Sequence, residues 1–314
     1  MASDQSKNEI RPRPKRVQVI VNPAPATRVP LLGMLNKKFR GADIDWDVSL
    51  THGPGDGKRL AEEAIADNVD VVIAYGGDGT VVEVASGMVG SDTPLLILSG
   101  GTGNLVAAEL RLSSNLERCL DLICKENYST RRIDVGMMGD RPFVLRVGCG
   151  IETEVVQEAT RELKNQFGKW AYVFAGIKTL QDAPEADYEI KIDGETINAR
   201  GMACIVANAG TVGVGRLMLA PTVDVNDGKL DVFFVKKTNI EAIFQLAGKM
   251  MGIDKEKNRD AEAKLDASKL VNHWSVTSVE INTDPVIDVQ VDGDVVEKTP
   301  ISIVARPKAL RVVV

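Results

Sequence analysis

The chain has 314 residues, of which 44% are hydrophobic and 26% are charged, and its formal net charge at pH 7 is −6. This composition is typical of a soluble globular protein, and the length favours two domains over one. The negative charge argues against a general nucleic-acid-binding protein and against a broad attraction to anionic membranes, so any membrane contact has to be local.

The cysteines and histidines exclude further classes of protein. The cysteines follow no metal-binding or redox spacing and lie in apolar stretches (Cys119, Cys124, Cys149 and Cys204). We therefore expect reduced, buried thiols and a cytoplasmic protein. With two histidines in the chain, a histidine triad or a zinc site is not expected. No stretch has the length of a membrane-spanning helix, and the first fifteen residues are polar, unlike a signal peptide.

The first elements alternate between strands and helices. Residues 1–14 are polar and are predicted to form a disordered tail. Residues 16–22 predict a strand, residues 29–39 a helix, and residues 44–50 a second strand with alternating apolar side chains. A turn with three glycines then follows Thr51 and leads into a second helix.

Residues 70–83 are the most informative stretch. They begin with an apolar run that predicts a buried strand, and three glycines follow it. We expect Gly76, Gly77 and Gly79 to permit positive φ angles and to leave no Cβ in the way of an incoming group. Thr80 and Glu83 fit a capping box that begins a helix. A strand, a glycine turn and a helix N-terminus together form a phosphate cradle, because free N–H groups and the helix dipole point to one place.

Asp78, at the centre of this turn, is the unusual residue. A carboxylate repels a phosphate unless a divalent cation, a proton or a hydroxyl donor lies between them. The turn has no lysine, which rules out the Walker A pattern, and its spacing is not that of the dinucleotide fingerprint. The alternative is a tight turn that only caps a helix.

A second turn repeats the pattern. Residues 93–100 predict an apolar strand that runs into a glycine turn, and a helix follows over residues 105–110. Turns of successive strand–helix units meet at the carboxyl ends of a parallel sheet, where open α/β sheets bind their ligands. The pair is therefore stronger support for a phosphate site than either turn alone. A further helix is predicted over residues 116–125.

The pattern changes to hairpins in the second half. Strands over residues 131–138 and 142–147 are predicted to pair around Gly139-Asp140, and further hairpins to turn at Asp193-Gly194 and Asp292-Gly293. The other predicted elements are strands over residues 230–236 and 276–282 and helices over residues 153–167, 169–180 and 254–269. We therefore expect a mainly antiparallel second domain.

Residues 76–80, Gly-Gly-Asp-Gly-Thr, resemble the nucleotide-binding signature of the diacylglycerol kinase and sphingosine kinase superfamily, which NAD kinases partly share. The other family motifs follow in family order, so the resemblance covers nearly the whole chain. Two motifs depart from the family: Asn22-Pro23 is followed by Pro25-Ala26 instead of Ser-Gly, and Ser99 replaces a proline. The resemblance implies a nucleotide site formed by Asn22, Thr51, Gly76, Gly77, Asp78, Gly79, Thr80, Val81, Val82, Gly101, Thr102 and Asn104.

The resemblance also implies a metal site and a catalytic base. The turn at residues 224–231 resembles the structural magnesium site of bacterial lipid kinases, which implies a side-chain ligand from Asp227 and carbonyl ligands from Asp224 and Lys229. The family's Asp-Gly-Glu turn, whose glutamate is the general base, has Asp294 in the glutamate's place. Without the resemblance, both would be ordinary hairpin turns. NAD kinases lack both turns, which favours the lipid-kinase branch.

The implied fold is α/β with two domains and a cleft between them. We expect a doubly wound, parallel nucleotide-binding domain over residues 15–133 and a β-rich, sandwich-like antiparallel domain over residues 134–314, whose last residues can return to the first domain. The implied function is an ATP-dependent, Mg²⁺-dependent lipid kinase, with Asp294 and Asp78 as catalytic residues and diacylglycerol as the acceptor.

Two alternatives to a diacylglycerol kinase remain: a kinase of another acceptor, and a homologue without kinase activity. Another kinase would act on a sphingoid base, another long-chain alcohol or an NAD-type soluble substrate, and a homologue without activity would only bind nucleotide or lipid. We expect a lipid alcohol at the membrane surface as partner, contact with the inner face of the membrane that is only peripheral, and no nucleic acid; a homodimer stays open.

Overall fold

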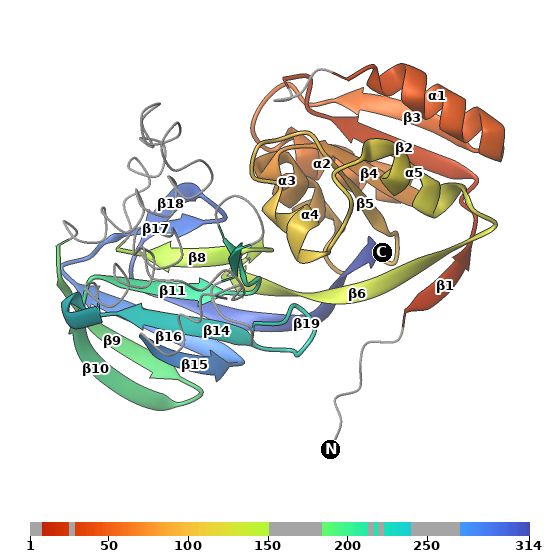
Figure 1. Ribbon diagram of the computed structural model, residues 1–314. Coiled ribbons are helices and arrows are strands. Elements are labelled where there is room, and N and C mark those ends of the chain that lie inside the picture. The colour runs from red at the N-terminus through yellow and green to blue at the C-terminus, as the bar shows by residue number, and fades with distance from the viewer. Residues whose placement is uncertain (1–7, 25–28, 151–183, 213–216, 219–222, 240–270) are drawn as a thin grey trace, which may run out of the picture. The chain divides into compact units, whose positions relative to one another are not determined.

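The computed structural model describes residues 8–24, 29–150, 184–212, 217–218, 223–239 and 271–314 (Figure 1). The chain divides into two compact units. The first comprises Met1–Val135, Val225–Gly228 and Arg306–Val314, and the second comprises Gly136–Asp224 and Lys229–Ala305. None of the helices in the described ranges is both long and apolar enough to cross a membrane.

The first unit contains a parallel sheet with strand order β5-β4-β2-β3. The end of β19 (Ile301–Val313) lies parallel to β5 at the outer side, with Val312 opposite Leu95. The other strands and helices of this unit are β2 (Arg16–Val21), α1 (Leu31–Ala42), β3 (Asp45–Leu50), α2 (Asp56–Ala66), β4 (Val71–Gly76), α3 (Asp78–Met88), β5 (Leu95–Ser99), α4 (Leu105–Glu109) and α5 (Leu116–Cys124). Helix α2 packs on α3, and α1 packs on α5, as expected when helices cover both faces of a doubly wound sheet.

The strand order reverses between β2 and β4. From β2 the chain passes to β3 on one side, and it then returns to β4 on the other side of β2. Every residue of β4 is buried, which explains why its sequence is an uninterrupted apolar run and not an alternating one. The carboxyl ends of β2 and β4 therefore flank the point where sheets of this type bind ligands.

The predicted disordered tail is wrong for residues 9–12. These residues form strand β1 (Glu9–Pro12), which pairs antiparallel with β6 (Asn127–Met138). The Glu9 carboxylate also accepts a hydrogen bond from the buried Arg311 at 2.6 Å. A polar sequence forms a strand here because its partners, β6 and Arg311, lie far from it in the sequence, which local composition does not reveal.

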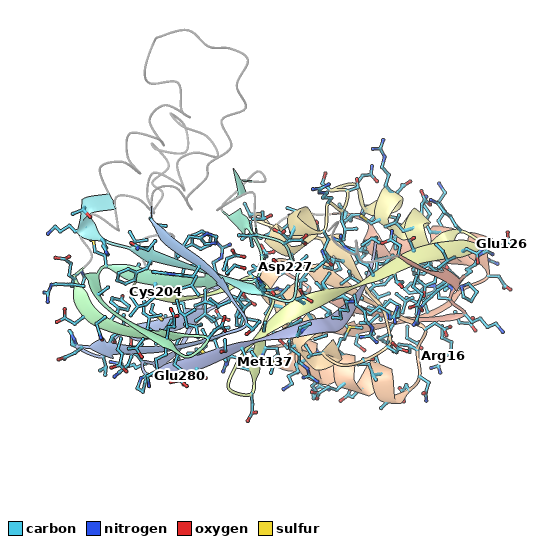
Figure 2. All side chains as sticks on the ribbon, turned by 90° about the horizontal axis from the view of Figure 1, so that it is seen from below. Arg16, Glu126, Met137, Cys204, Asp227 and Glu280 are labelled. Atoms are coloured by element: carbon cyan, nitrogen blue, oxygen red, sulfur yellow. The ribbon has the colours of Figure 1, made fainter. Side chains whose placement is uncertain are left out.

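The second unit is built from antiparallel strands. One group has the order β10-β9-β16-β19 and the other β15-β14-β11-β8-β17-β18. Their bounds, with the remaining short elements, are β7 (Arg141–Phe143), β8 (Arg146–Cys149), β9 (Ala186–Ile192), β10 (Glu195–Gly201), β11 (Ala203–Ala207), β12 (Thr211–Val212), β13 (Leu217–Met218), β14 (Leu230–Val235), a 3₁₀ helix (Lys237–Asn239), β15 (Asn272–Val276), β16 (Ser278–Asp284), β17 (Asp288–Val291) and β18 (Asp294–Lys298). Apolar residues of both groups form one core. Cys204 lies inside this core, and Glu280 points away from it (Figure 2).

The three predicted hairpins are confirmed. Gly139-Asp140 joins β6 to β7, and Asp193-Gly194 joins β9 to β10. Asp292-Gly293 joins β17 to β18, with φ angles of 49° and 105° that suit a type I′ turn. Two predicted strands are each divided in two, because residues 142–147 contribute to β7 and β8 and residues 276–282 to β15 and β16. The helices predicted over residues 153–167, 169–180 and 254–269 lie outside the described residues.

The cysteines agree with the sequence analysis in most respects. All four are free thiols; Cys119, Cys149 and Cys204 are buried, whereas Cys124 is half-buried. Burial raises the pKa of the Cys149 thiol to about 12, so this thiol stays protonated and unreactive at neutral pH.

Candidate functional site

The two glycine turns lie against each other in the first unit. The turn after β4 and the turn after β5 begin side by side, since Gly76 is paired with Ser99 and the Gly100 N–H donates to the Gly76 carbonyl at 2.8 Å. A Cβ atom added to Gly101 would lie 2.5 Å from the Gly77 Cα atom. Gly101 is therefore required by the close approach of two backbones.

The glycines of the first turn do not adopt the positive φ angles that they can permit. Gly76, Gly77 and Gly79 are absent from the described glycines with positive φ, and Gly77 is extended, with φ −82° and ψ −176°. The absence of a Cβ is what matters, because a Cβ on Gly76 would lie 2.6 Å from the Thr80 Cβ. At Gly79, by contrast, an added Cβ would meet no atom within 4 Å, so this position faces open space.

Helix α3 begins three residues earlier than the capping box predicts, which has Thr80 as the N-cap. Its first residue is Asp78 and its N-cap is Gly77, and no side chain caps it. The first hydrogen bond within the helix runs from the Val81 N–H to the Gly77 carbonyl at 3.1 Å. The N–H groups of Asp78, Gly79 and Thr80 precede this bond and form the positive N-terminal end of α3, an arrangement that suits an anion.

Glu83 caps a different helix. Its two carboxylate oxygens accept hydrogen bonds from the N–H groups of Gly55 and Gly57, both at 2.9 Å, at the start of α2. Gly55 is the N-cap of that helix and has no side chain to do so. The capping prediction was therefore right about the chemistry of Glu83 and wrong about its partner, because Glu83 lies one and a half turns into α3 and faces α2.

Asp78 connects the first turn to the helix after the second turn. Its Oδ1 atom accepts a hydrogen bond from the Val106 N–H at 3.2 Å, in the first turn of α4. A Cβ added to Gly103 would lie 2.8 Å from Oδ2, so Gly103 leaves room for this carboxylate. Asp78 is thereby held at the junction of the two turns, with a side chain that is half-buried.

Asn104 shapes the second turn from within. It has a φ angle of 51°, its Oδ1 accepts from the Gly101 N–H at 3.0 Å, and its Nδ2 donates to the Gly101 carbonyl at 2.8 Å. Both ends of the amide are thus used to close the turn, and the adjacent Thr102 is exposed. An asparagine fits this position because its short side chain tolerates a left-handed backbone.

The other predicted nucleotide residues of this unit lie at the same edge of the sheet. At the end of β2, Asn22 donates from Nδ2 to the Thr80 hydroxyl at 3.1 Å, and its Oδ1 accepts from the Ala24 N–H at 2.9 Å. At the end of β3, the Thr51 N–H donates to the Val21 carbonyl at 3.0 Å. A groove of about 850 Å³ adjoins Asn22 and is lined mainly by apolar side chains, among them Leu32 and Leu50.

Val81 and Val82 are placed differently from the other residues of the predicted set. The Val81 side chain is buried in the core, and its N–H is bonded within α3. Val82 is half-buried, and its carbonyl accepts a hydrogen bond from the Ser86 hydroxyl at 2.8 Å. These two residues lie in the body of the helix, whereas the N–H groups suited to an anion belong to the three residues before them.

Asp294 belongs to the second unit. It is exposed, begins β18 and is paired with Val291 across the hairpin. Asp292, two residues earlier, does more than form the predicted turn. Its carboxylate accepts hydrogen bonds from the N–H groups of Val144 and Arg146, both at 2.8 Å, and of Leu145 at 2.9 Å. Burial of the Asp292 carboxyl raises its pKa, while these hydrogen bonds lower it in part.

The predicted metal turn is fastened by a buried carboxylate. Asp134 accepts hydrogen bonds from the N–H groups of Gly228 at 2.6 Å and Lys308 at 2.7 Å, and its own N–H donates to the Val225 carbonyl at 2.7 Å. These residues all belong to the first unit, although the turn was predicted to lie in the second domain. Asp227 is exposed beside them (Figure 2).

The donors of this turn fit Mg²⁺ by their chemistry. Hard oxygen ligands are what Mg²⁺ prefers, and the implied set has one carboxylate, from Asp227, and the carbonyls of Asp224 and Lys229. The described part of the chain holds no group of three or more His, Cys, Asp or Glu side chains arranged for a metal ion. The implied Mg²⁺ ligand set has one carboxylate and two backbone carbonyls, so it does not belong to this class of metal site.

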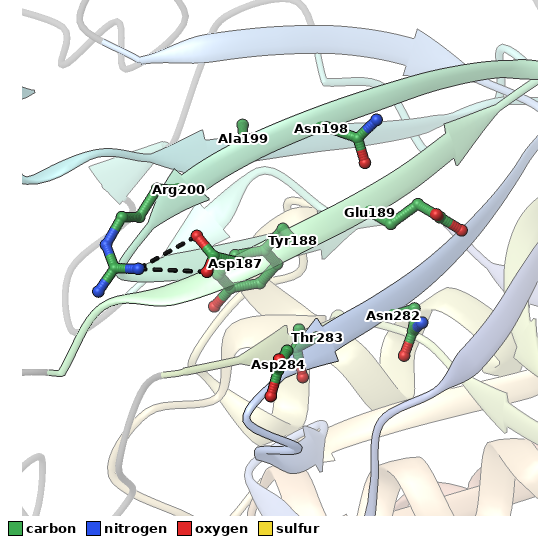
Figure 3. A pocket seen from close by; sticks show the side chains of 9 residues that line it. All are labelled: Asp187, Tyr188, Glu189, Asn198, Ala199, Arg200, Asn282, Thr283 and Asp284. Atoms are coloured by element: carbon green, nitrogen blue, oxygen red, sulfur yellow. Dashed lines mark hydrogen bonds and ion pairs between the residues drawn. The ribbon is translucent and has the colours of Figure 1, made fainter.

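A second hollow lies on the second unit. It has a volume of about 420 Å³ and is lined by residues of β9, β10 and β16 (Figure 3). Its wall is acidic, with Asp187, Glu189 and Asp284, and Arg200 donates to both carboxylate oxygens of Asp187 at 3.2 Å. None of the residues predicted to bind nucleotide or metal, or to act as a catalytic base, lines this hollow.

Comparisons with known proteins agree with this arrangement. Residues 16–138 match the diacylglycerol kinase catalytic domain, and residues 146–314 match the YegS C-terminal NAD kinase beta sandwich-like domain. The chain is 30% identical over 238 residues to the diacylglycerol kinase of Bacillus subtilis (strain 168), which covers 74% of this chain and 78% of that protein. It is 28% identical over 290 residues to "Putative lipid kinase SH2167" of Staphylococcus haemolyticus (90% of this chain, 89% of that protein).

A solved structure shows the same fold. It is that of "a putative diacylglycerol kinase from Bacillus anthracis str. Sterne", with a TM-score of 0.77 and 25% sequence identity over 100% of this chain and 98% of that chain. The α/β fold with an antiparallel, sandwich-like second domain is thereby confirmed. From its two matching domains and its relatives, the chain belongs to the diacylglycerol kinase family, with a diacylglycerol kinase catalytic domain followed by a YegS-type C-terminal domain.

Proposed function

We propose that the protein is an ATP-dependent lipid kinase that transfers the γ-phosphoryl group to the hydroxyl of diacylglycerol and forms phosphatidic acid. The observation that carries this proposal is the pair of glycine turns at the carboxyl ends of β4 and β5. The N-terminus of α3, together with the half-buried Asp78 carboxylate between the turns, would form an anion cradle that could also hold a cation. The names of the relatives support diacylglycerol over other acceptors.

Each residue has a distinct part in this reaction. The N–H groups of Asp78, Gly79 and Thr80 would hold the nucleotide phosphates, and the turn at Gly101 and Thr102 would bound them on the other side. Mg²⁺, when bound, would neutralise phosphate charge. The Asp78 carboxylate would hold this cation at the junction of the turns, where the Val106 N–H fixes its orientation.

Asp294 is the proposed general base. Its carboxylate is exposed and so is accessible to the hydroxyl of an acceptor, from which it would take the proton. Asp292 would position it, because the three N–H bonds to Asp292 fix the turn from which β18 begins. Phosphoryl transfer depends mainly on alignment and charge stabilisation, so one carboxylate base is sufficient.

The proposed setting is the inner face of the membrane, which the protein would contact only peripherally. The acceptor is a lipid, and the chain carries a net charge of −6, so that contact would be local. A second Mg²⁺ ion would bind at the Asp227 carboxylate and the carbonyls of Asp224 and Lys229. It would stabilise the structure and take no part in the chemical step.

A transfer assay tests the proposal. The full-length protein is incubated with ATP labelled in the γ-phosphate, Mg²⁺ and one acceptor at a time: diacylglycerol, sphingosine, monoacylglycerol or NAD. We expect label in a chloroform-soluble product that runs with phosphatidic acid on thin-layer chromatography. Label in another lipid product or in the aqueous phase would reassign the acceptor. ATP binding without transfer to any acceptor would make the protein a binding homologue, a role that the replacement of the family's glutamate by Asp294 would then explain.

A further inference from the structure

Three arginines of the first unit converge on one carboxylate, away from the glycine turns. The Asp92 Oδ1 atom accepts hydrogen bonds from Arg311 Nη2, at 3.1 Å, and from Arg132 Nη2. Arg11 Nη2 lies 3.8 Å from the Oδ2 atom of Asp92. Asp92 is in the loop that precedes β5, so the cluster lies at the amino end of this strand, whereas the glycine turns follow the carboxyl ends.

Arg311 is the fixed centre of this arginine cluster (Arg11, Arg132 and Arg311). Its side chain is only 7% exposed, and its Nη1 atom donates to Glu9 Oε2 at 2.6 Å and to the Thr130 hydroxyl at 3.2 Å. Its Nε atom is buried and has no hydrogen-bond partner within the described part of the chain. A buried guanidinium with an unused donor indicates a site whose polar requirements are incompletely met.

The carboxylate at the cluster is far more exposed than the arginines. The side chain of Asp92 is 72% exposed, against 24% for Arg11 and 29% for Arg132. The arginines are thus largely covered by the fold, while Asp92 can leave them by a rotation into solvent that opens no core. The hydrogen bond from Arg311 lowers the pKa of Asp92, with further lowering by the charge of Arg132, so at neutral pH its carboxylate is charged.

The charges around the loop favour an anion. Three guanidinium groups face two carboxylates, those of Glu9 and Asp92, and the positive excess grows when Asp92 moves away. Arg306 borders the same loop, because a Cβ added to Gly90 would lie 3.5 Å from its Nη2 atom. This local excess stands out in a chain whose net charge is negative.

We propose that the arginine cluster is a binding site for a phosphate group and that Asp92 occupies it as an internal carboxylate, which a phosphate displaces. Arginine forks bind carboxylates and phosphates with the same paired N–H geometry, and a phosphate brings more negative charge and a third acceptor oxygen. The phosphate can belong to a soluble compound or to a lipid headgroup. The site is separate from the glycine turns and does not depend on the proposed kinase activity.

Asp92→Asn is the variant that tests this site. Asparagine keeps the size of the side chain but has no charge to hold the arginines, so phosphate no longer has to displace a competing carboxylate. The matched control is Asp121→Asn, which also removes a carboxylate that is paired with a cation, in this case Lys38 at 2.6 Å, and whose side chain is 48% exposed. A third variant, Asp92→Asn with Arg132→Gln, removes one arginine of the site.

The measurement is the unfolding temperature of the full-length proteins against inorganic phosphate, with chloride added to keep the ionic strength constant. Phosphate bound at the glycine turns affects all variants alike. We expect Asp92→Asn to be stabilised at phosphate concentrations at least about tenfold lower than the wild type and Asp121→Asn, because a competing state of the site is gone. The double variant should lose this gain.

A second measurement distinguishes the sources of the phosphate. Vesicles of phosphatidylcholine, with or without phosphatidic acid, are sedimented with the same variants. Greater sedimentation of Asp92→Asn that depends on phosphatidic acid and on Arg132 assigns the site to a lipid headgroup; a gain in the inorganic phosphate titration alone assigns it to a soluble phosphate compound. Equal phosphate stabilisation of Asp92→Asn, Asp121→Asn and the wild type, with equal sedimentation, would overturn the proposal and leave the cluster as an anchor for β1.

Discussion

The glycines of the two turns are required for different structural reasons. Gly101 lies where the two backbones are too close for any side chain, and Gly76 lies where Thr80 fills the space of a Cβ. Gly77, by contrast, has its nearest described neighbour at 3.6 Å from an added Cβ, which is an ordinary contact. Replacement of these residues therefore separates the effect of packing the turns from the effect of blocking a ligand.

Gly101→Ala should damage the site through the fold. The added methyl would lie 2.5 Å from the Gly77 Cα, so one turn must shift, and we expect a loss of about 1–3 kcal/mol in the free energy of unfolding. ATP affinity, measured by calorimetry at a temperature where the variant is folded, should fall as well. The control is Gly79→Ala, which meets no atom within 4 Å and should be at least as stable as the wild type. Equal stability of the two variants would contradict the contact between the turns.

Asp294→Asn should lower the rate of phosphoryl transfer and leave ATP binding nearly unchanged. Asparagine keeps the size of the side chain but cannot take a proton, so turnover should fall by roughly 10²- to 10⁴-fold while ATP binding stays nearly unchanged. The measurement is turnover at saturating ATP on folded protein. Near-normal turnover would remove Asp294 from the mechanism and pass the role of base to Asp78 or to solvent.

Asp294→Glu asks whether the missing methylene limits the reach of the base. It restores the residue that the family carries at this position, and the exposed start of β18 has room for the longer side chain. If reach is limiting, the glutamate variant should equal or exceed the wild-type turnover. A lower turnover than the wild type would show that the site is adapted to aspartate.

At the scale of elements, the strand–turn–helix units could be predicted from the sequence, whereas their side-chain partners could not. The apolar run of β4 and its glycine turn are local patterns, and the hairpin at Asp292-Gly293 follows from the φ preferences of its two residues. Glu83 is different: its sequence neighbours predict a cap for its own helix, but the tertiary packing of α3 on α2 brings it to Gly55 and Gly57. Local sequence does not encode such partners.

The contact between Glu83 and α2 makes a prediction for these two helices. Glu83→Ala removes the acceptor for two N–H groups at the start of α2, and we expect a loss of about 1–2 kcal/mol in the free energy of unfolding. The control is Glu62→Ala, an exposed residue of α2 whose ion pair with Lys58 spans 3.9 Å and should contribute less than about 0.5 kcal/mol. Denaturant unfolding of both variants measures the difference. An equal loss in the two would show that the cap of α2 does not depend on Glu83.

For the whole molecule, the parts that sequence reasoning missed are joined by contacts between distant segments. Strand β1 pairs with β6, and Arg311, from the last residues of the chain, bonds to Glu9 near its start. Asp134 holds Gly228 and Lys308, which are 94 and 174 residues further along the chain. No local pattern marks such pairs, because each residue is an ordinary polar residue until the fold supplies its partner. The family motifs, in contrast, are contiguous and were recognisable from the sequence.

The turn at Asp227 makes a prediction about the stability of the whole chain. The proposed cation would have the Asp227 carboxylate as its single side-chain ligand, with carbonyl ligands from Asp224 and Lys229 on either side of the turn. Mg²⁺ that binds the folded chain and not the unfolded chain stabilises it by mass action. We therefore expect the unfolding temperature of the wild type to rise with Mg²⁺ and to fall back when a chelator is added. In Asp227→Ala, which lacks the single side-chain ligand, this rise should be much smaller, whereas the control Asp140→Ala, an exposed aspartate of another turn, should keep it.

Because Asp227 is assigned to structure, turnover of Asp227→Ala should recover at temperatures well below its unfolding transition. Equal stabilisation by Mg²⁺ in all three proteins would place the stabilising cation elsewhere, with Asp78 as the next carboxylate to replace.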